Sequence, residues 1–358
     1  MQKLTRRTKI VVTVVIVALV AGGLTAEILT SSAPGDPCAG IVTPTSTVGG
    51  ATSPTQTVSS HPRASAAPTV HPDAAVPDDS SSPILVVAAE NFWGSLVSQL
   101  GGNQTNVTSI VTDPNTDPHE YEASATVAQE ISNAQFVIVN GVGYDQWAIS
   151  ILQADGNSAQ EVLNVGDLNG VSVNGGIVSG NPHMWYNPLY VNATVAAMYS
   201  DLVSIRPSAT AYFQAQYAAL NVSLGELYGQ AAAIRDHFAG TVVASTESIF
   251  VYLANFTHLD LVSPPEFMEA VAEGNDPPPQ SVVEFQCQLE SGHVRVLVFN
   301  AQTVTPVTDS MKSIAASNNV TVIGITETIQ PPTYTFQQWM GAEYLQLYNA
   351  LNANALGQ

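Results

Sequence analysis

The sequence predicts an α/β protein in which two lobes, each built on a parallel sheet flanked by helices, are joined by one long helix. Three observations predict this fold. Short apolar runs alternate with helical patterns from residue 83 to about 141, and the same alternation returns from about 241 to 325. One long helical pattern separates the two regions. Continuous apolar runs are typical of strands buried on both faces, and their alternation with helices is typical of parallel sheets.

The first lobe is expected over residues 83–205. Its expected strands are the apolar runs Ile84–Ala89, Val107–Val111 and Phe136–Asn140. Its expected helices cover Asn91–Leu100, which the Gly101-Gly102 pair ends, and Ala123–Asn133.

The connecting helix is expected over residues 206–238, and the second lobe over residues 239–358. Within the connecting helix the only proline is Pro207, at the start, where a helix tolerates proline. The second lobe repeats the pattern of the first, so we expect the following elements in order: a strand over Thr241–Ala244, a helix over Glu247–Asn255, a strand over Val294–Phe299, a helix ending at Ser317 and a strand over Val320–Ile325.

Residues 1–29 have the pattern of a secretory signal peptide or a membrane anchor. Four basic residues lie within the first nine positions, and the apolar run Ile10–Ala21 follows them. A run of this length suits a cleaved signal, while the small and apolar residues that follow leave an uncleaved anchor open. The protein is therefore expected to be exported. It would be tethered to the outer side of the cytoplasmic membrane, or periplasmic or secreted if the signal is cleaved.

Residues 30–82 are expected to form a disordered linker. The segment is rich in Ser, Thr, Pro and Ala and contains no aromatic residue, so it cannot bury enough surface to offset chain entropy. Cys38 lies in this linker and raises the alternative of lipidation, but the preceding Pro-Gly-Asp-Pro lacks the small and apolar residues typical of that site.

The composition excludes several classes of function. The 358 residues include 9 Lys and Arg against 29 Asp and Glu, and from Pro83 onward only four are basic. Such a surface repels phosphate, so no nucleic-acid partner is expected. Two cysteines exclude a disulfide scaffold and a multi-cysteine metal site. Cys287 is expected to be a buried free thiol, with a disulfide to Cys38 as the alternative.

Polar residues that follow the predicted strands are the candidates for a binding site. Ligands of parallel sheets bind beyond the carboxyl ends of the strands. Three candidates follow predicted strands, and His183 lies in a loop before the mid-chain helix. Two imidazoles and two carboxylates thus arise from four separate loops: His119, His183, Glu247 and Glu327. This donor set suits Zn²⁺ or Mn²⁺. Because the four residues come from both lobes, the ion would lie in the cleft between them.

Four motifs resemble the cluster A-I substrate-binding proteins of metal ABC transporters. They are Asp117–Glu122 (DPHEYE) followed by Val139–Gly141, Asn181–Trp185 (NPHMW), Glu247–Tyr252 (ESIFVY) and Thr326–Ile329 (TETI). The resemblance extends in order over Pro83–Ala355. It implies two similar lobes, a rigid connecting helix and one ion per chain, held by His119, His183, Glu247 and Glu327.

The implied function is that of an extracytoplasmic receptor, not an enzyme, which delivers Zn²⁺ or Mn²⁺ to the membrane permease of an ABC importer. A monomer is expected. The sequence departs from the family pattern at Glu327, where Asp is common, and no histidine lies between His119 and His183, where zinc members often have a His-rich loop. The third ligand is Glu247 where other members have His, and this choice together with the missing His-rich loop favours manganese or a mixed preference, so the metal stays open.

Two alternatives come from other classes of protein. A secreted metal-dependent hydrolase could use Glu120 or Glu122 as general base, but four protein ligands would close the coordination position that catalysis needs. Neither HExxH nor Gly-x-Ser-x-Gly is present. A surface adhesion module would suit an exported, tethered protein, although nothing in the sequence encodes a partner surface.

Overall fold

A computed structural model describes residue 38 and residues 82–113, 121–155, 157–174 and 177–355. The predicted signal or anchor, most of the predicted linker and the loop with His119 lie outside these residues. Within the described part, no helix combines the length and the apolar character needed to cross a bilayer. Both sheets of the fold belong to one compact unit.

The first sheet consists of four parallel strands in the order β2-β1-β3-β4. Strand β1 (Ile84–Glu90) is buried on both faces. Its Val86 and Ala88 belong to a core that includes Phe92 of helix α1, whereas Val87 and Ala89 pack with residues of helices α2 and α3 on the opposite face. The remaining elements are β2 (Thr105–Val111), β3 (Phe136–Val139), β4 (Glu161–Asn164), α1 (Asn91–Gly101), α2 (Ala125–Asn133) and α3 (Gln146–Asp155).

The second sheet repeats this topology. Its order is β10-β9-β7-β8, and all its pairs are parallel. In both sheets the first strand in the chain lies between the second and the third, so each sheet has a switch point beyond the carboxyl ends of its first and third strands. The elements are β7 (Val242–Ser245), β8 (Asp260–Leu261), β9 (Val296–Asn300), β10 (Thr321–Ile325), α7 (Val251–Thr257), α8 (Pro265–Ala272), α9 (Pro279–Glu290) and α10 (Pro306–Ser317).

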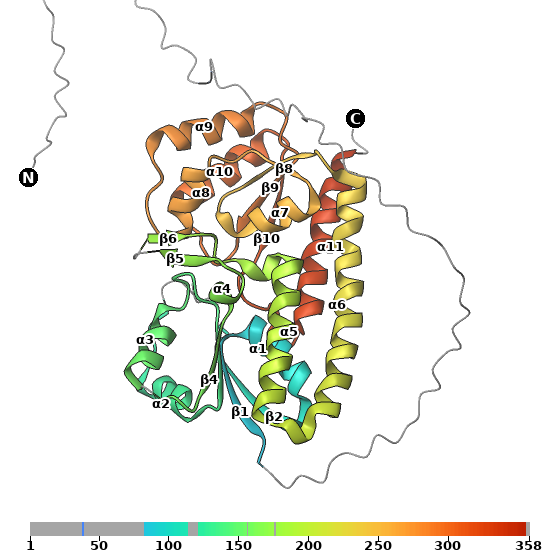
Figure 1. The fold of residues 1–358 in the computed structure, drawn as a ribbon. Helices are drawn as coiled ribbons and strands as arrows, with labels where there is room; N and C mark the ends of the chain where they lie inside the picture. Colours follow the sequence, from blue (N-terminus) through green and yellow to red (C-terminus); the bar gives the residue numbers. More distant parts are fainter. Residues whose placement is uncertain (1–37, 39–81, 114–120, 156, 175–176, 356–358) are drawn as a thin grey trace, which may run out of the picture. The chain divides into compact units, whose positions relative to one another are not determined.

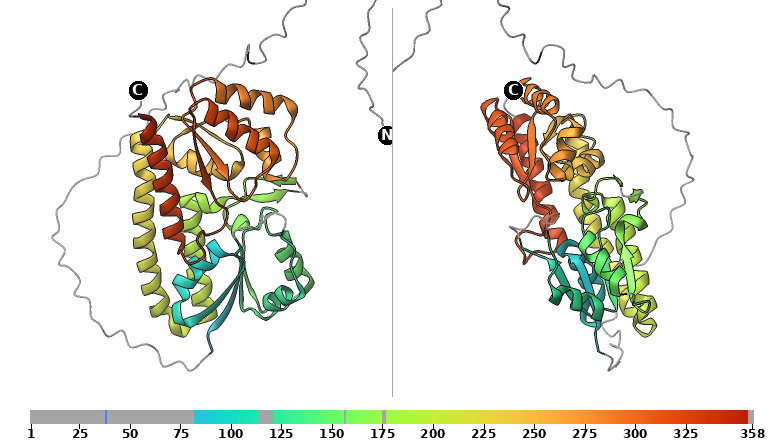
Figure 2. Two further views of the ribbon diagram at one scale, coloured as in Figure 1. Left: turned by 180° about the vertical axis from the view of Figure 1, so that it is seen from behind. Right: turned by 90° about the vertical axis from the view of Figure 1, so that its left-hand side faces the viewer.

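Three further helices connect and cover the two sheets. Helix α5 (Pro188–Ile205) leads to α6 (Thr210–Phe238), and α11 (Phe336–Ala355) packs along α6 and runs in the same direction. Figures 1 and 2 show α6 and α11 side by side, extending from the region of the first sheet to that of the second. Smaller elements between β4 and α5 are α4 (Val165–Leu168) and the hairpin β5 (Ser172–Asn174) and β6 (Ile177–Ser179).

The predicted fold class is confirmed: two parallel sheets, flanked by helices, with a long helix between them. Two of the predicted helices begin later than expected. Residues 207–209 form a separate turn of 3-10 helix, so α6 begins at Thr210. Glu247 has an extended backbone and is followed by a short 3-10 turn, so α7 begins at Val251 and not at Glu247.

Both cysteines of the chain, Cys38 and Cys287, are disulfide-bonded. The expectation that Cys287 is a free thiol is therefore wrong, although its burial is as expected. Oxidised cysteines are typical of proteins outside the cytoplasm.

Candidate metal centre

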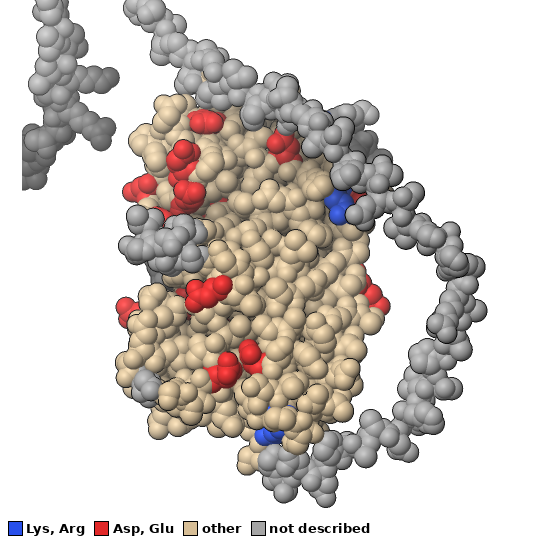
Figure 3. All heavy atoms as spheres, viewed as in Figure 1, with Lys and Arg blue, Asp and Glu red and all other residues tan. Residues whose placement is uncertain are grey.

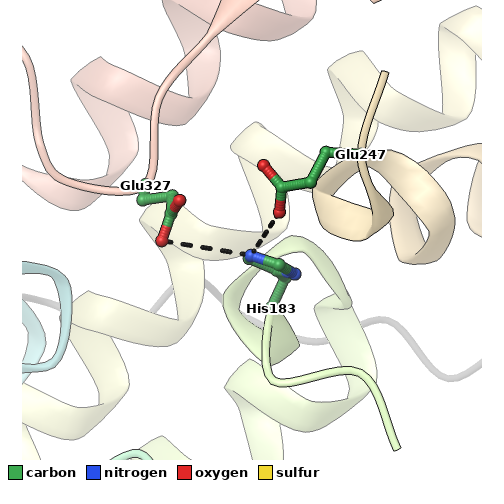
Figure 4. A group of neighbouring side chains, drawn as sticks. All are labelled: His183, Glu247 and Glu327. Carbon is green, nitrogen blue, oxygen red and sulfur yellow. Dashed lines mark ion pairs between the residues drawn. The ribbon is translucent and has the colours of Figure 1, made fainter. Parts of the chain in front are cut away.

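Three of the four predicted ligands meet between the two sheets. His183, Glu247 and Glu327 are all completely buried, and one donor atom from each lies within 4.8 Å of the others. Nε2 of His183 is 3.2 Å from Oε1 of Glu247 and 4.0 Å from Oε2 of Glu327. Figure 4 shows the two carboxylates on either side of the imidazole nitrogen. The fourth predicted ligand, His119, lies outside the described residues.

The imidazole of His183 is held in one orientation by Asn181. Oδ1 of Asn181 lies 2.7 Å from Nδ1 of His183 and also accepts the His183 backbone N–H at 2.9 Å. Because Nδ2 of Asn181 donates to the Ser248 carbonyl, its Oδ1 faces the ring and can only accept. Nδ1 therefore bears a hydrogen, and Nε2 is the ring nitrogen that faces the two carboxylates. A hydrogen bond of this kind orients most metal-binding histidines.

Asn300 contacts both carboxylates through the oxygens that do not face His183. It is the last residue of β9 and is fully buried. Its Nδ2 donates to Oε2 of Glu247 and, at 2.5 Å, to Oε1 of Glu327. Its Oδ1 accepts the backbone N–H of Gln302, which fixes the orientation of the amide. The amide thus brings the two acidic side chains together, while Oε1 of Glu247 and Oε2 of Glu327 face His183.

The loop that contains Glu327 is fixed by residues from both lobes. Oε1 of Gln302 accepts the backbone N–H groups of Glu327 and Thr328 at 2.8 and 2.9 Å. From the first lobe, the hydroxyl of Tyr144 donates to Oε2 of Glu327 at 2.6 Å. The position of Glu327 therefore depends on the packing of the first lobe as well as on its own loop.

Aromatic side chains enclose the imidazole. The ring centroids of His183 and Trp185 are 5.2 Å apart in an edge-on arrangement, and Trp185 stacks on Phe92 of α1 at 4.1 Å. Tyr144 packs against Trp185 at 5.3 Å. All of these rings are buried. A site enclosed in this way has a low effective dielectric, in which a charge interacts strongly with its neighbours.

This arrangement fits a divalent transition-metal ion. Donor atoms at about 2.1 Å from a tetrahedral Zn²⁺ are separated by about 3.4 Å, and the two observed distances from Nε2 lie on either side of that value. When ionised, the two buried carboxylates would have two negative charges, which one divalent cation would balance. Burying such charges without a counter-charge is costly. Imidazole nitrogen with carboxylate oxygen suits both Zn²⁺ and Mn²⁺.

A second pair of buried acids lies at the carboxyl edge of the first sheet. Asp145 accepts the backbone N–H groups of Asn140 and Gly141 at 2.6 and 2.8 Å. Burial raises the pKa of Asp145 to about 6. Burial, and then the nearby Asp145, raise the pKa of Glu90 well above its usual value. Glu90 is therefore the member of the pair that keeps its proton, which lowers the charge buried in this lobe.

Several residues around the site were not among the sequence candidates. Asn300 directly follows the predicted strand Val294–Phe299, so the strand-end rule that identified Glu247 and Glu327 applies to it equally. Tyr144 follows β3 but bears no ligand atom typical of metals, and no sequence signal links it to Glu327.

Comparison with known proteins places these features in a family. The model of the family described as zinc-uptake complex component A, periplasmic (ZnuA) matches residues 86–350. The manganese-binding lipoprotein MntA of Halalkalibacterium halodurans is 26% identical over 145 residues, which are 40% of this chain and 47% of that protein. The chain thus matches about half the length of this relative.

Solved structures share the fold at low sequence identity. The crystal structure of ZnuA has 19% identity and a TM-score of 0.62, and the match covers 75% of this chain and 100% of that one. A mutant structure of the laminin-binding adhesin Lmb from Streptococcus agalactiae has 16% identity and a TM-score of 0.63, over 75% and 99% of the two chains. At such identities the likeness concerns the fold alone.

Proposed function

Because the chain belongs to the family of periplasmic zinc-uptake component A, the metal-binding proteins of ABC uptake systems, we propose that it captures one divalent transition-metal ion between its lobes. In this proposal His183, Glu247 and Glu327, together with His119, are the four ligands. The family is one of binding proteins and not of enzymes. The ion is cargo, and no chemistry is done on it.

One observation supports the proposal above all others. Nε2 of an imidazole held in one orientation faces two carboxylates in a fully buried space, and the three residues follow different elements of the fold. An arrangement built only for stability would gain little from two acidic groups held together without water. An ion bound there would hold both lobes and would lose its hydration shell.

The candidate ions are Zn²⁺ and Mn²⁺. MntA is a manganese-binding protein by name, and ZnuA belongs to zinc uptake, so relatives point to both metals. Two carboxylates among the ligands favour a harder ion than an all-histidine site would, whereas the general affinity order favours Zn²⁺. We therefore propose a site that takes both ions.

The protein acts outside the cytoplasm, in agreement with its family and its oxidised cysteines. We propose that residues 1–29 direct export and that residues 30–82 tether the folded part to the membrane. In this position a monomer would hand its ion to the permease of an ABC importer. The acidic excess of the chain would attract cations. Figure 3 shows acidic side chains scattered over one face, with far fewer basic ones among them.

The test is calorimetric titration of the full-length protein, stripped with a chelator, with Zn²⁺ and Mn²⁺ in parallel. We expect one ion per chain. His183→Ala and Glu247→Gln should abolish saturable binding, because each removes a ligand from the buried site. His293→Ala and Glu269→Gln are matched controls at exposed positions, and they should bind like the wild type. Titration of His119→Ala tests the ligand that the structure does not describe.

Two results would contradict the proposal. The first is the absence of stoichiometric binding of either ion to the folded protein. The second is binding that His183→Ala and Glu247→Gln leave unchanged. The likeness to a laminin-binding adhesin at 16% identity concerns the fold and gives no support to an adhesive function here.

A further inference from the structure

Two of the proposed ligand loops are joined behind the site by side chains that bind no ion. His183 begins a short 3-10 turn, Met184–Tyr186, and the backbone N–H of Tyr186 donates to the His183 carbonyl at 3.1 Å. Thr326 directly precedes Glu327. The side chain of Tyr186 and the backbone of Thr326 meet in the buried space between these two loops.

The hydroxyl of Tyr186 contacts the Glu327 loop directly. Its oxygen lies 2.9 Å from the carbonyl oxygen of Thr326 and 2.6 Å from Oε2 of Glu343, a residue of α11. Burial, and then the nearby Glu343, raise the pKa of Tyr186 well above its usual value, so the hydroxyl stays protonated and donates. The single hydroxyl hydrogen therefore has two acceptors, of which the carboxylate is nearer.

The carboxyl group of Glu343 binds the other side of the same loop. Its Oε1 accepts the backbone N–H of Thr326 at 2.9 Å, the hydroxyl of Thr326 at 3.2 Å and Nε1 of Trp339 at 3.0 Å. Glu343 thus accepts from four donors, although it is almost completely buried. Burying an acidic group costs free energy, which hydrogen bonds to several donors offset. Of the donors here, Tyr186 belongs to the His183 loop and Thr326 belongs to the Glu327 loop.

We propose that Tyr186 and Glu343 form a positioning link that holds the His183 and Glu327 loops at the separation the ion requires. The inference rests on the proposed function, because it assigns these two residues a role in the same site. Neither touches the ion. They act through backbone position, so their loss should speed the release of the ion from a protein that is still folded.

Four variants distinguish a role in positioning the two loops from a general contribution to the stability of the fold. Tyr186→Phe removes the hydroxyl and keeps the ring, and Glu343→Leu removes all four acceptor contacts at similar volume. Glu343→Gln keeps an oxygen that can accept from Thr326 and Trp339, and its amide NH₂ can donate to the hydroxyl of Tyr186. This variant should therefore preserve the link. Tyr228→Phe is the matched control, because the buried hydroxyl of Tyr228 makes no hydrogen bond within the described part of the chain.

The first measurement is amide hydrogen exchange in the metal-free protein. The backbone N–H of Thr326 should exchange faster in Tyr186→Phe and in Glu343→Leu than in the wild type. It should be unchanged in Tyr228→Phe and nearly unchanged in Glu343→Gln. This comparison needs no metal.

The second measurement is the rate at which bound Zn²⁺ passes to a chromogenic chelator. Loss of a residue that orients metal ligands typically costs about 10–100-fold in affinity, so we expect release at least about tenfold faster in Tyr186→Phe and Glu343→Leu. In Glu343→Gln and Tyr228→Phe, the rate of Zn²⁺ release should stay within about threefold of the wild-type rate.

Equal behaviour of Tyr186→Phe and Tyr228→Phe in both measurements would overturn the link. Faster exchange at Thr326 with unchanged release of Zn²⁺ would overturn its role in the metal site. A wild-type protein that binds no Zn²⁺ and no Mn²⁺ would instead overturn the proposed function, and the exchange comparison would still decide whether the two loops are linked.

Discussion

The hydroxyl of Tyr144 lies 2.6 Å from Oε2 of Glu327, so a side chain that follows β3 of the first sheet contacts a proposed ligand that follows β10 of the second. The same oxygen of Glu327 faces Nε2 of His183 at 4.0 Å. A candidate ligand oxygen of the second lobe is thus oriented by the first lobe, while Asn300 contacts the other oxygen of the same carboxylate.

Tyr144→Phe tests this contact. The variant loses the donor that orients Oε2 of Glu327 and keeps the ring that packs against Trp185. We expect the affinity for Zn²⁺ and Mn²⁺ to fall by about tenfold, as is usual for residues that orient metal ligands. Calorimetric titration measures the change, and Tyr334→Phe, at an exposed tyrosine, is the control. An unchanged affinity would show that Glu327 keeps its position without this hydroxyl.

Asn300→Asp tests the amide that joins the two carboxylates. The change replaces a shared donor with a third acidic group, which repels Glu247 and Glu327 in a buried space. We expect a lower melting temperature in the metal-free protein and a larger rise on adding Zn²⁺ than in the wild type. Thermal unfolding with and without metal measures both. Asn221→Asp, at an exposed position of α6, should change neither, and an equal metal-induced rise in both variants would contradict the role of Asn300.

The raised pKa of Glu343 predicts that the free energy of unfolding depends on pH. Burial raises its pKa from 4.5 to about 7. In the folded protein it keeps its proton up to about pH 7, whereas in the unfolded chain it loses the proton near pH 4.5. The folded state therefore binds more protons, and the stabilisation from this proton is lost as the pH rises through about 7.

The measurement is urea unfolding of metal-free wild type and Glu343→Gln from pH 5 to pH 8. The unfolding free energy of the wild type, relative to the variant, should fall by roughly 1 kcal/mol per pH unit at its steepest. Glu269→Gln, at an exposed glutamate, should show no such difference from the wild type. A constant difference between wild type and Glu343→Gln would mean that Glu343 does not titrate in this range.

Because both cysteines are oxidised, the structure predicts how many reactive thiols the protein has before and after reduction. Because Cys38 and Cys287 are both disulfide-bonded, the unreduced protein should show no reactive thiol even when fully unfolded. Two thiols per chain should appear after reduction. Titration with a thiol reagent in denaturant measures both states. One or two reactive thiols before reduction, in protein isolated from an oxidising compartment, would contradict the structure.

The strands were predictable where both faces of the sheet are covered. Strands β1, β3, β9 and β10 are short apolar runs for this reason, and their predicted positions agree with the structure to within two residues at each end. Strand β8 is different, because it has only two residues, Asp260 and Leu261, at the edge of its sheet. So short a segment has no pattern that distinguishes it from a loop.

Two long helices were missed although their sequences contain the signal. In α5, the buried residues Val191, Val195, Met198 and Leu202 follow the spacing i, i+4, i+7 and i+11. In α11, Met340, Tyr344, Leu347 and Leu351 follow the same spacing and are also buried. This spacing is typical of a helix with one buried face. The omission concealed Glu343, since an acidic residue in a segment of unassigned structure gives no reason to expect burial.

The site was predictable only in part. The strand-end rule identified Glu247 and Glu327, and His183 was a candidate from its loop before the mid-chain helix. The structure brings these three side chains together. Their role as ligands stays a prediction, as does that of His119. The contacts that position them come from tertiary packing: Tyr144 is 183 residues from Glu327 in the sequence, and Tyr186 is 157 residues from Glu343. Without a structure no local pattern relates such pairs.

Helix α6 has 29 residues and no internal proline, so it extends roughly 44 Å at 1.5 Å per residue, with α11 packed along it. A continuous helix supported in this way offers no backbone hinge between the sheets. Separating the lobes widely would bend both helices, so we expect ions to enter and leave through movements of loops and side chains. Such movements expose little apolar surface, and ion binding should therefore cause only a small change in heat capacity.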